Sequence, residues 1–113
     1  MRQVNFTAIP LQPATTVTSA AIPAVNLFYC SAQASVVGAG SGTLKLQASN
    51  DDTNGESNTV PTNWSDIPLA TVSVTGAGAF LIPKIDLCYQ YVRLVYTNTG
   101  AGTINVVFKA LGA

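Results

Sequence analysis

Residues 38–48 read GAGSGTLKLQA, a flexible turn that runs straight into a segment of alternating apolar and polar residues. The same arrangement returns at residues 76–82, GAGAFLI, and at residues 100–108, GAGTINVVF. Glycine supplies the positive φ that tight turns require, and an apolar alternation with a period of two is typical of half-buried strands. The three repeats therefore predict antiparallel strands joined by tight hairpins.

The rest of the chain continues this pattern, because helical periodicity is nearly absent and 9 glycines and 6 prolines punctuate the sequence. We expect strands at residues 2–9, 14–21, 26–37, 43–49, 70–75, 79–82, 89–97 and 103–110. About eight strands without a helix predict an all-β fold, a single antiparallel β-sandwich of jelly-roll-like type over residues 1–113. Residues 1–13 are expected to form either an edge strand or an extended N-terminal arm, since prolines interrupt them.

Several predicted strands have one face that is clearly apolar. Alternation places three rows of side chains in the predicted core: Leu44, Leu46 and Ala48; Val92, Leu94 and Tyr96; Ile104, Val106 and Phe108. By the same parity, Cys30 shares the inward side with Phe28 and Ala32, and Cys88 shares it with Val92. We expect two buried free thiols, with a disulfide between them as the alternative.

Charge is unusually scarce: only 9% of the residues are charged, five of each sign, for a formal net charge of zero. Ordinary domains carry about 25% charged residues. Low net charge gives little protection against association, which favours a surface that neighbouring molecules cover. The alternative is a rigid β domain that its hydroxyl and amide groups keep soluble unaided. Five scattered cations disfavour nucleic acid as a partner. We expect neither a membrane span nor a signal peptide, because no apolar run approaches ~20 residues and no apolar segment follows residues 1–7.

Catalytic motifs are missing from the sequence. The chain has no histidine, which excludes Ser-His-Asp and Cys-His catalysis. It contains neither a G-x-G-x-x-G fingerprint nor a Walker loop, and its Gly-Ala-Gly turns precede predicted strands rather than helices. We therefore expect a protein that is not an enzyme and that uses no cofactor.

The longest predicted loop, residues 50–66, carries two weak candidate sites. Asn50, Asp52 and Asn54 precede Gly55 with the alternate spacing of a calcium loop, but Pro61 stands where such a loop places its glutamate. Local turns made by Asp and Asn side chains are the preferred interpretation. Trp64 either closes the sandwich by packing or stacks on a sugar ring. In the second case Tyr89, Asp51 and Asp52 are the expected further glycan contacts.

Four motifs in succession carry a resemblance to a known group of proteins: GTLKLQASND at residues 42–51, NWSDIP at 63–68, YVRLVY at 91–96 and GTIN at 102–105. This succession resembles small β-sandwich domains encoded by tailed bacteriophages and prophages. The resemblance implies a virion component made in the host cytoplasm: a capsid decoration protein, or part of a spike or fibre. It also implies a homo-oligomer, a trimer first and a dimer second, with phage capsid or tail proteins as further partners.

The predicted mechanism is therefore assembly by burial of neutral surface. The N-terminal segment has strand-like alternation, and its apolar residues are the expected assembly contacts: Val4, Phe6, Ile9 and Leu11. The alternative function is a carbohydrate-binding module for attachment to a host surface glycan.

Overall fold

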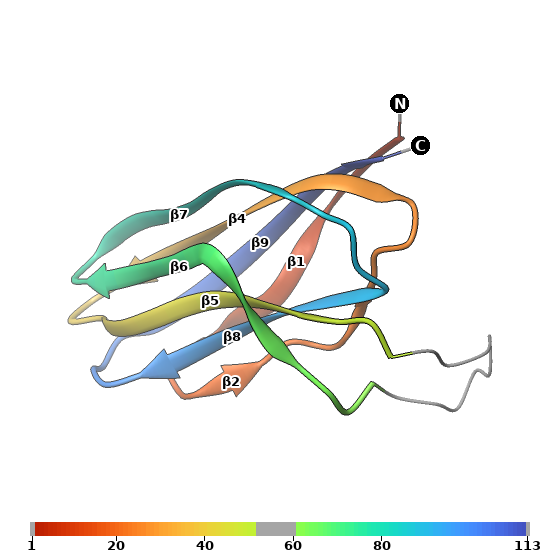
Figure 1. Ribbon diagram of the computed structural model, residues 1–113. Coiled ribbons are helices and arrows are strands. Elements are labelled where there is room, and N and C mark those ends of the chain that lie inside the picture. The colour runs from red at the N-terminus through yellow and green to blue at the C-terminus, as the bar shows by residue number, and fades with distance from the viewer. Residues whose placement is uncertain (1, 52–60, 113) are drawn as a thin grey trace.

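The computed structural model describes residues 2–51 and 61–112, which form nine strands (Figure 1). The strands are β1 (Arg2–Pro13), β2 (Val17–Thr18), β3 (Ile22–Pro23), β4 (Leu27–Val37), β5 (Ser41–Ser49), β6 (Ser65–Thr75), β7 (Gly78–Asp86), β8 (Tyr91–Asn98) and β9 (Thr103–Gly112). Within these two described ranges there is no helix, and so none long and apolar enough to cross a membrane.

Two antiparallel sheets pack face to face. One has the order β1-β9-β4-β7, and the other has the order β2-β8-β5-β6, with β3 also paired to β8. If the short β2 and β3 are counted as one interrupted edge strand, each sheet has four strand positions, as in a jelly roll. The predicted all-β sandwich is confirmed.

The Gly-Ala-Gly turns do not make hairpins, and this part of the prediction is wrong. They join β4 to β5, β6 to β7 and β8 to β9, and in each case the two strands belong to different sheets. Two sheets of a sandwich lie about 10 Å apart, so these turns carry the chain across the sandwich rather than back along one sheet. All three lie at the same end of the molecule (Figure 1), which we call the turn end.

Backbone packs directly on backbone at the turn end. The amide of Ala101 donates to the carbonyl oxygen of Ala39 at 2.9 Å, and the amide of Ala14 donates to that of Gly102 at 2.8 Å. Gly102 has φ +93°, and a Cβ added to it would lie 2.2 Å from the carbonyl oxygen of Val37. Glycine is required there both by its backbone conformation and by the space available.

The three predicted core rows are buried as expected. Val92, Leu94, Tyr96, Ile104, Val106 and Phe108 are 0% exposed, and Leu44, Leu46 and Ala48 are at most 8% exposed. The buried Tyr96 hydroxyl donates to the carbonyl oxygen of Ser41 at 3.2 Å. Burial raises the pKa of Tyr96.

Some predicted strand bounds and two predicted buried residues differ from the structure. The strand expected at residues 14–21 is replaced by the short β2 and β3, and β6 begins at Ser65 rather than at residue 70. Phe28 is exposed because the register with β9 shifts between Leu27 and Tyr29. Cys88 is also exposed, because it lies after the end of β7, where the alternation of β8 no longer applies.

Cys30 occupies the core as expected. Neither cysteine forms a disulfide, and burial raises the pKa of the Cys30 thiol to about 12.

Candidate interaction surfaces

An apolar groove of about 450 Å³ follows one long edge of the sandwich. Val4 and Phe6 of β1 form one wall, and Ile22, Val25 and Leu27 contribute to the other. The groove exists because β1 is the edge of one sheet and the neighbouring edge of the other sheet is reduced to the short β2 and β3. None of the described residues that line it is charged. Such a groove binds by burying apolar surface.

The four expected assembly residues take different positions along β1. Val4 is half-buried and Phe6 is 38% exposed, and both line the groove. Phe6 is held in place by Phe108, whose ring centroid lies 5.6 Å away. Ile9 is in the core, 1% exposed, and Leu11 is 71% exposed but does not line the groove. The strand itself pairs with β9 from Arg2 to Pro13.

Apolar surface continues from the groove towards the start of β4. Val25 and Leu27 also line an adjoining hollow that includes Phe28 and Cys88. Val25 is 65% exposed and Phe28 is 49% exposed. We call the groove and this hollow together the groove surface. Several apolar side chains are exposed on it next to one another. Alternation could not identify Val25, because it lies in a turn, and it misplaced Phe28 because of the shift of register.

The opposite edge carries a protruding leucine. Lys45 of β5 pairs with Thr71 of β6, but Gln47 pairs with Asp66, so residues 67–70 bulge out of the ladder. Figure 1 shows β6 bending between its two halves. Leu69 lies in this bulge, 90% exposed, with φ +65°. It is the one non-glycine residue with positive φ among the residues that the structure describes.

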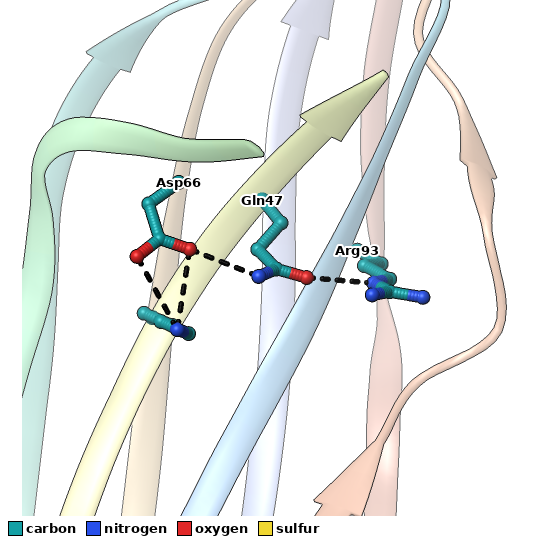
Figure 2. A network of polar contacts seen from close by, with 4 residues as sticks. Gln47, Asp66 and Arg93 are labelled. Atoms are coloured by element: carbon teal, nitrogen blue, oxygen red, sulfur yellow. Dashed lines mark hydrogen bonds and ion pairs between the residues drawn. The ribbon is translucent and has the colours of Figure 1, made fainter. Parts of the chain in front are cut away.

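A polar network covers part of the outer face of the sheet that contains β5 (Figure 2). Lys45 lies 3.2 Å from a carboxylate oxygen of Asp66, and Gln47 Nε2 donates to the same carboxylate at 2.9 Å. Arg93 Nε donates to Gln47 Oε1 at 2.9 Å. Hydrogen bonding by Gln47, followed by that of Lys45, lowers the pKa of Asp66. This network links β6, β5 and β8 side by side.

Trp64 packs against this network. The Arg93 guanidinium carbon lies 4.3 Å from the centroid of the Trp64 ring, and Trp64 Nε1 donates to the Pro61 carbonyl oxygen at 3.1 Å. Trp64 is half-buried, and Arg93 occupies one face of its ring. Tyr89, also half-buried, lines two shallow hollows beside Asn50. Neither hollow is lined by Trp64, so the expected glycan contacts do not share one hollow.

Asp51 organises the described part of the long loop. Its carboxylate accepts the backbone amides of Thr62 at 2.7 Å and Asn63 at 3.0 Å, and also the Asn63 side-chain amide at 3.0 Å. These hydrogen bonds, led by those from Asn63, lower the pKa of Asp51.

Of the calcium candidates, Asn50 accepts the Gln90 amide at 3.0 Å, whereas Asp52 and Asn54 lie outside the described residues. In residues 2–51 and 61–112, no cluster of three His, Cys, Asp or Glu side chains is placed to hold a metal.

No protein-family model and no curated protein matches the chain. Among solved structures, the SPBc2 prophage-derived protein YomS is similar over 96% of this chain and 92% of its own, with a TM-score of 0.63 and 12% identity. PirA is similar over 94% of this chain and 92% of its own, with a TM-score of 0.54 and 15% identity. Identities this low show a shared fold alone. The chain therefore has the same β-sandwich fold as a prophage-derived protein.

Proposed function

We propose that this chain is a non-enzymatic structural subunit of a bacteriophage particle. It acts as a capsid decoration protein, or as part of a spike or fibre, by binding copies of itself and neighbouring capsid or tail proteins. The single observation that carries the proposal is the groove surface, where Phe6, Val25 and Phe28 expose apolar area next to an uncharged groove.

The energetics of the groove surface favour a protein partner over water. Contiguous exposed apolar surface beside a groove marks interaction sites, because its burial is favourable by about 25 cal/mol per Å². Zero net charge also removes long-range repulsion between copies of the chain. The bacteriophage setting is supported at the level of fold, by the shared sandwich of the prophage-derived protein and by the motifs quoted above.

The oligomeric state of a matched pair of variants tests the proposal. Val25→Asp places a charge on the groove surface, whereas Val37→Asp places it at a valine of similar exposure, 69% against 65%, in the turn-end half of β4. Light scattering on a sizing column at micromolar concentration should give a discrete oligomer for the wild type and for Val37→Asp. Val25→Asp should elute as a monomer. A monomeric wild type, or an equal response of the two variants, would contradict the proposal.

The exposed thiol of Cys88 gives a second test that uses the wild-type sequence. Cys88 lines the groove surface and is exposed, whereas Cys30 is buried and serves as the internal control. Assembly should slow maleimide labelling of Cys88 as the protein concentration rises, because neighbouring copies cover it. Labelling that is independent of concentration, in a sample that is oligomeric by light scattering, would place the contact elsewhere.

A further inference from the structure

We propose that Leu69 of one copy inserts into the groove of the next copy, so that the chain assembles head to tail. This inference rests on the proposed function, because it identifies the occupant of the groove as a second copy and names the side chain that fills it. The first argument is the cost of Leu69 in a single copy. A leucine with φ +65° is strained, and at 90% exposure it gains almost no packing in return.

The bulge in β6 presents this leucine outwards. Ile67 and Ala70 on either side are buried, at 6% and 0% exposure, and so they anchor both ends of the bulge. Pro68 and Leu69 between them are exposed, and proline restricts the backbone just before the leucine. Leu69 is therefore an apolar side chain held away from the sheet on a short, anchored support.

The groove has the chemistry and the position to receive it. It is lined by apolar side chains such as Val4, Phe6 and Ile22, and its volume of about 450 Å³ lies within the range of about 300–1,000 Å³ that is typical of small-molecule pockets, so it has room for a leucine side chain. Residues 67–75 of β6 contain no charged residue, and neither do residues 19–27 on the groove wall. Contact between these two segments therefore removes no charged group from water and brings no like charges together.

The topology prevents a copy from filling its own groove. β6 is one edge of its sheet, whereas β2 and β3 occupy the other edge, next to the groove. A contact between two different edges is heterologous: each copy offers one Leu69 and one groove. Such contacts close into a ring when the rotation between copies allows it, and otherwise extend into a filament. The trimer that the resemblance to phage domains implies is one such ring.

A mixing experiment tests the direction of this contact. Leu69→Asn removes the protruding side chain and places a residue that tolerates positive φ, while Val25→Asp blocks the groove surface. Each variant alone should be a monomer by light scattering. An equimolar mixture should form a dimer of twice the chain mass that grows no further, since one intact Leu69 meets one intact groove. Leu81→Asn, at 57% exposure on β7, is the control and should retain the wild-type mass.

A cooperative thermal unfolding transition is the check that Leu69→Asn is folded. Leu69→Asn should have a higher Tm than the monomeric Val25→Asp, because it relieves backbone strain. Wild-type mass for Leu69→Asn, together with a monomeric Val25→Asp, would overturn the head-to-tail contact and leave the proposed function standing. Two monomeric variants whose mixture stays monomeric would also overturn it, because an intact Leu69 would then fail to bind an intact groove. A wild type that is itself a monomer would overturn the inference and the proposed function together.

Discussion

The two ends of the sandwich are held by different kinds of contact. At the turn end, three glycine-containing turns lie together, and two of them pair backbone to backbone, as between Ala101 and Ala39. At the opposite end, where β5 ends and β6 begins, side chains make the ties: Asp51 to the amides of Thr62 and Asn63, and Trp64 to Arg93. We call this the loop end. The turn end therefore has no space for added atoms where the turns approach closely, as at Gly102, whereas the loop end depends on the charge and size of particular side chains.

The largest expected effect is at the turn end. Gly102→Ala should lower the free energy of unfolding by about 3 kcal/mol, because the new Cβ meets the Val37 carbonyl oxygen and the positive φ is strained. Gly76→Ala is the matched control, since its φ is +119° and no atom lies within 4 Å of the added Cβ. It should lose only about 1 kcal/mol, from strain. Urea unfolding of both variants measures the difference, and equal losses would show that close backbone packing is not what constrains this end.

A smaller effect is expected at the loop end. Trp64→Ala should lower the free energy of unfolding by about 2 kcal/mol, since a half-buried ring and its stacking on Arg93 are lost. Trp64→Phe keeps a ring over Arg93 but loses the hydrogen bond to Pro61, and it should lie between wild type and Trp64→Ala. Sugar binding by the wild type, lost in Trp64→Ala without a change in Tm, would instead support the carbohydrate-binding alternative.

A single hydroxyl at the turn end should have a smaller effect still. Tyr96→Phe removes the donor to the Ser41 carbonyl oxygen from a side chain that is 0% exposed. The expected loss is about 1 kcal/mol, because the ring still fills the core and only the hydrogen bond is missing. Urea unfolding measures this loss of free energy, and the m-value should not change. A loss as large as that of Gly102→Ala would mean that the hydroxyl positions the turns themselves.

The smallest effect should appear as a dependence on pH at the loop end. The pKa of Asp51 is lowered in the folded protein, so the ionised carboxylate adds stability above its unfolded pKa, and this contribution is lost as pH falls through the folded pKa. We expect wild-type Tm to fall between pH 5 and pH 3, and to fall less in Asp51→Asn.

The matched control for Asp51→Asn is Asp86→Asn. Its carboxylate has the 4.0 Å contact with Lys84 and, among the described residues, accepts no backbone hydrogen bond. This variant should show the wild-type fall in Tm. An identical acid response of wild type and Asp51→Asn would show that Asp51 does not stabilise the loop end.

The candidate surfaces were only partly predictable from the sequence. The apolar residues of the first strand included Val4 and Phe6, which line the groove, but also Leu11, which does not. Leu69 was not predicted, because its exposure and its φ depend on a bulge opposite β5. The bulge shifts the inward parity of β6, since Ile67 and Ala70 are both buried although they lie three positions apart, and local alternation by itself does not show where such a shift occurs.

The amino-acid sequence by itself determined the class of fold and the composition of the core. Rows such as Val92, Leu94 and Tyr96 follow from alternation, since a strand in a sandwich must bury one of its two faces. Only the tertiary structure decided which strands are neighbours, and so turned the expected hairpins into crossings between sheets. It also decided that Phe28 and Cys88 are exposed and that the groove and Leu69 lie on opposite edges. The physical reason is that local pattern fixes which face of a strand is buried, whereas pairing, register and edges depend on residues far apart in the chain.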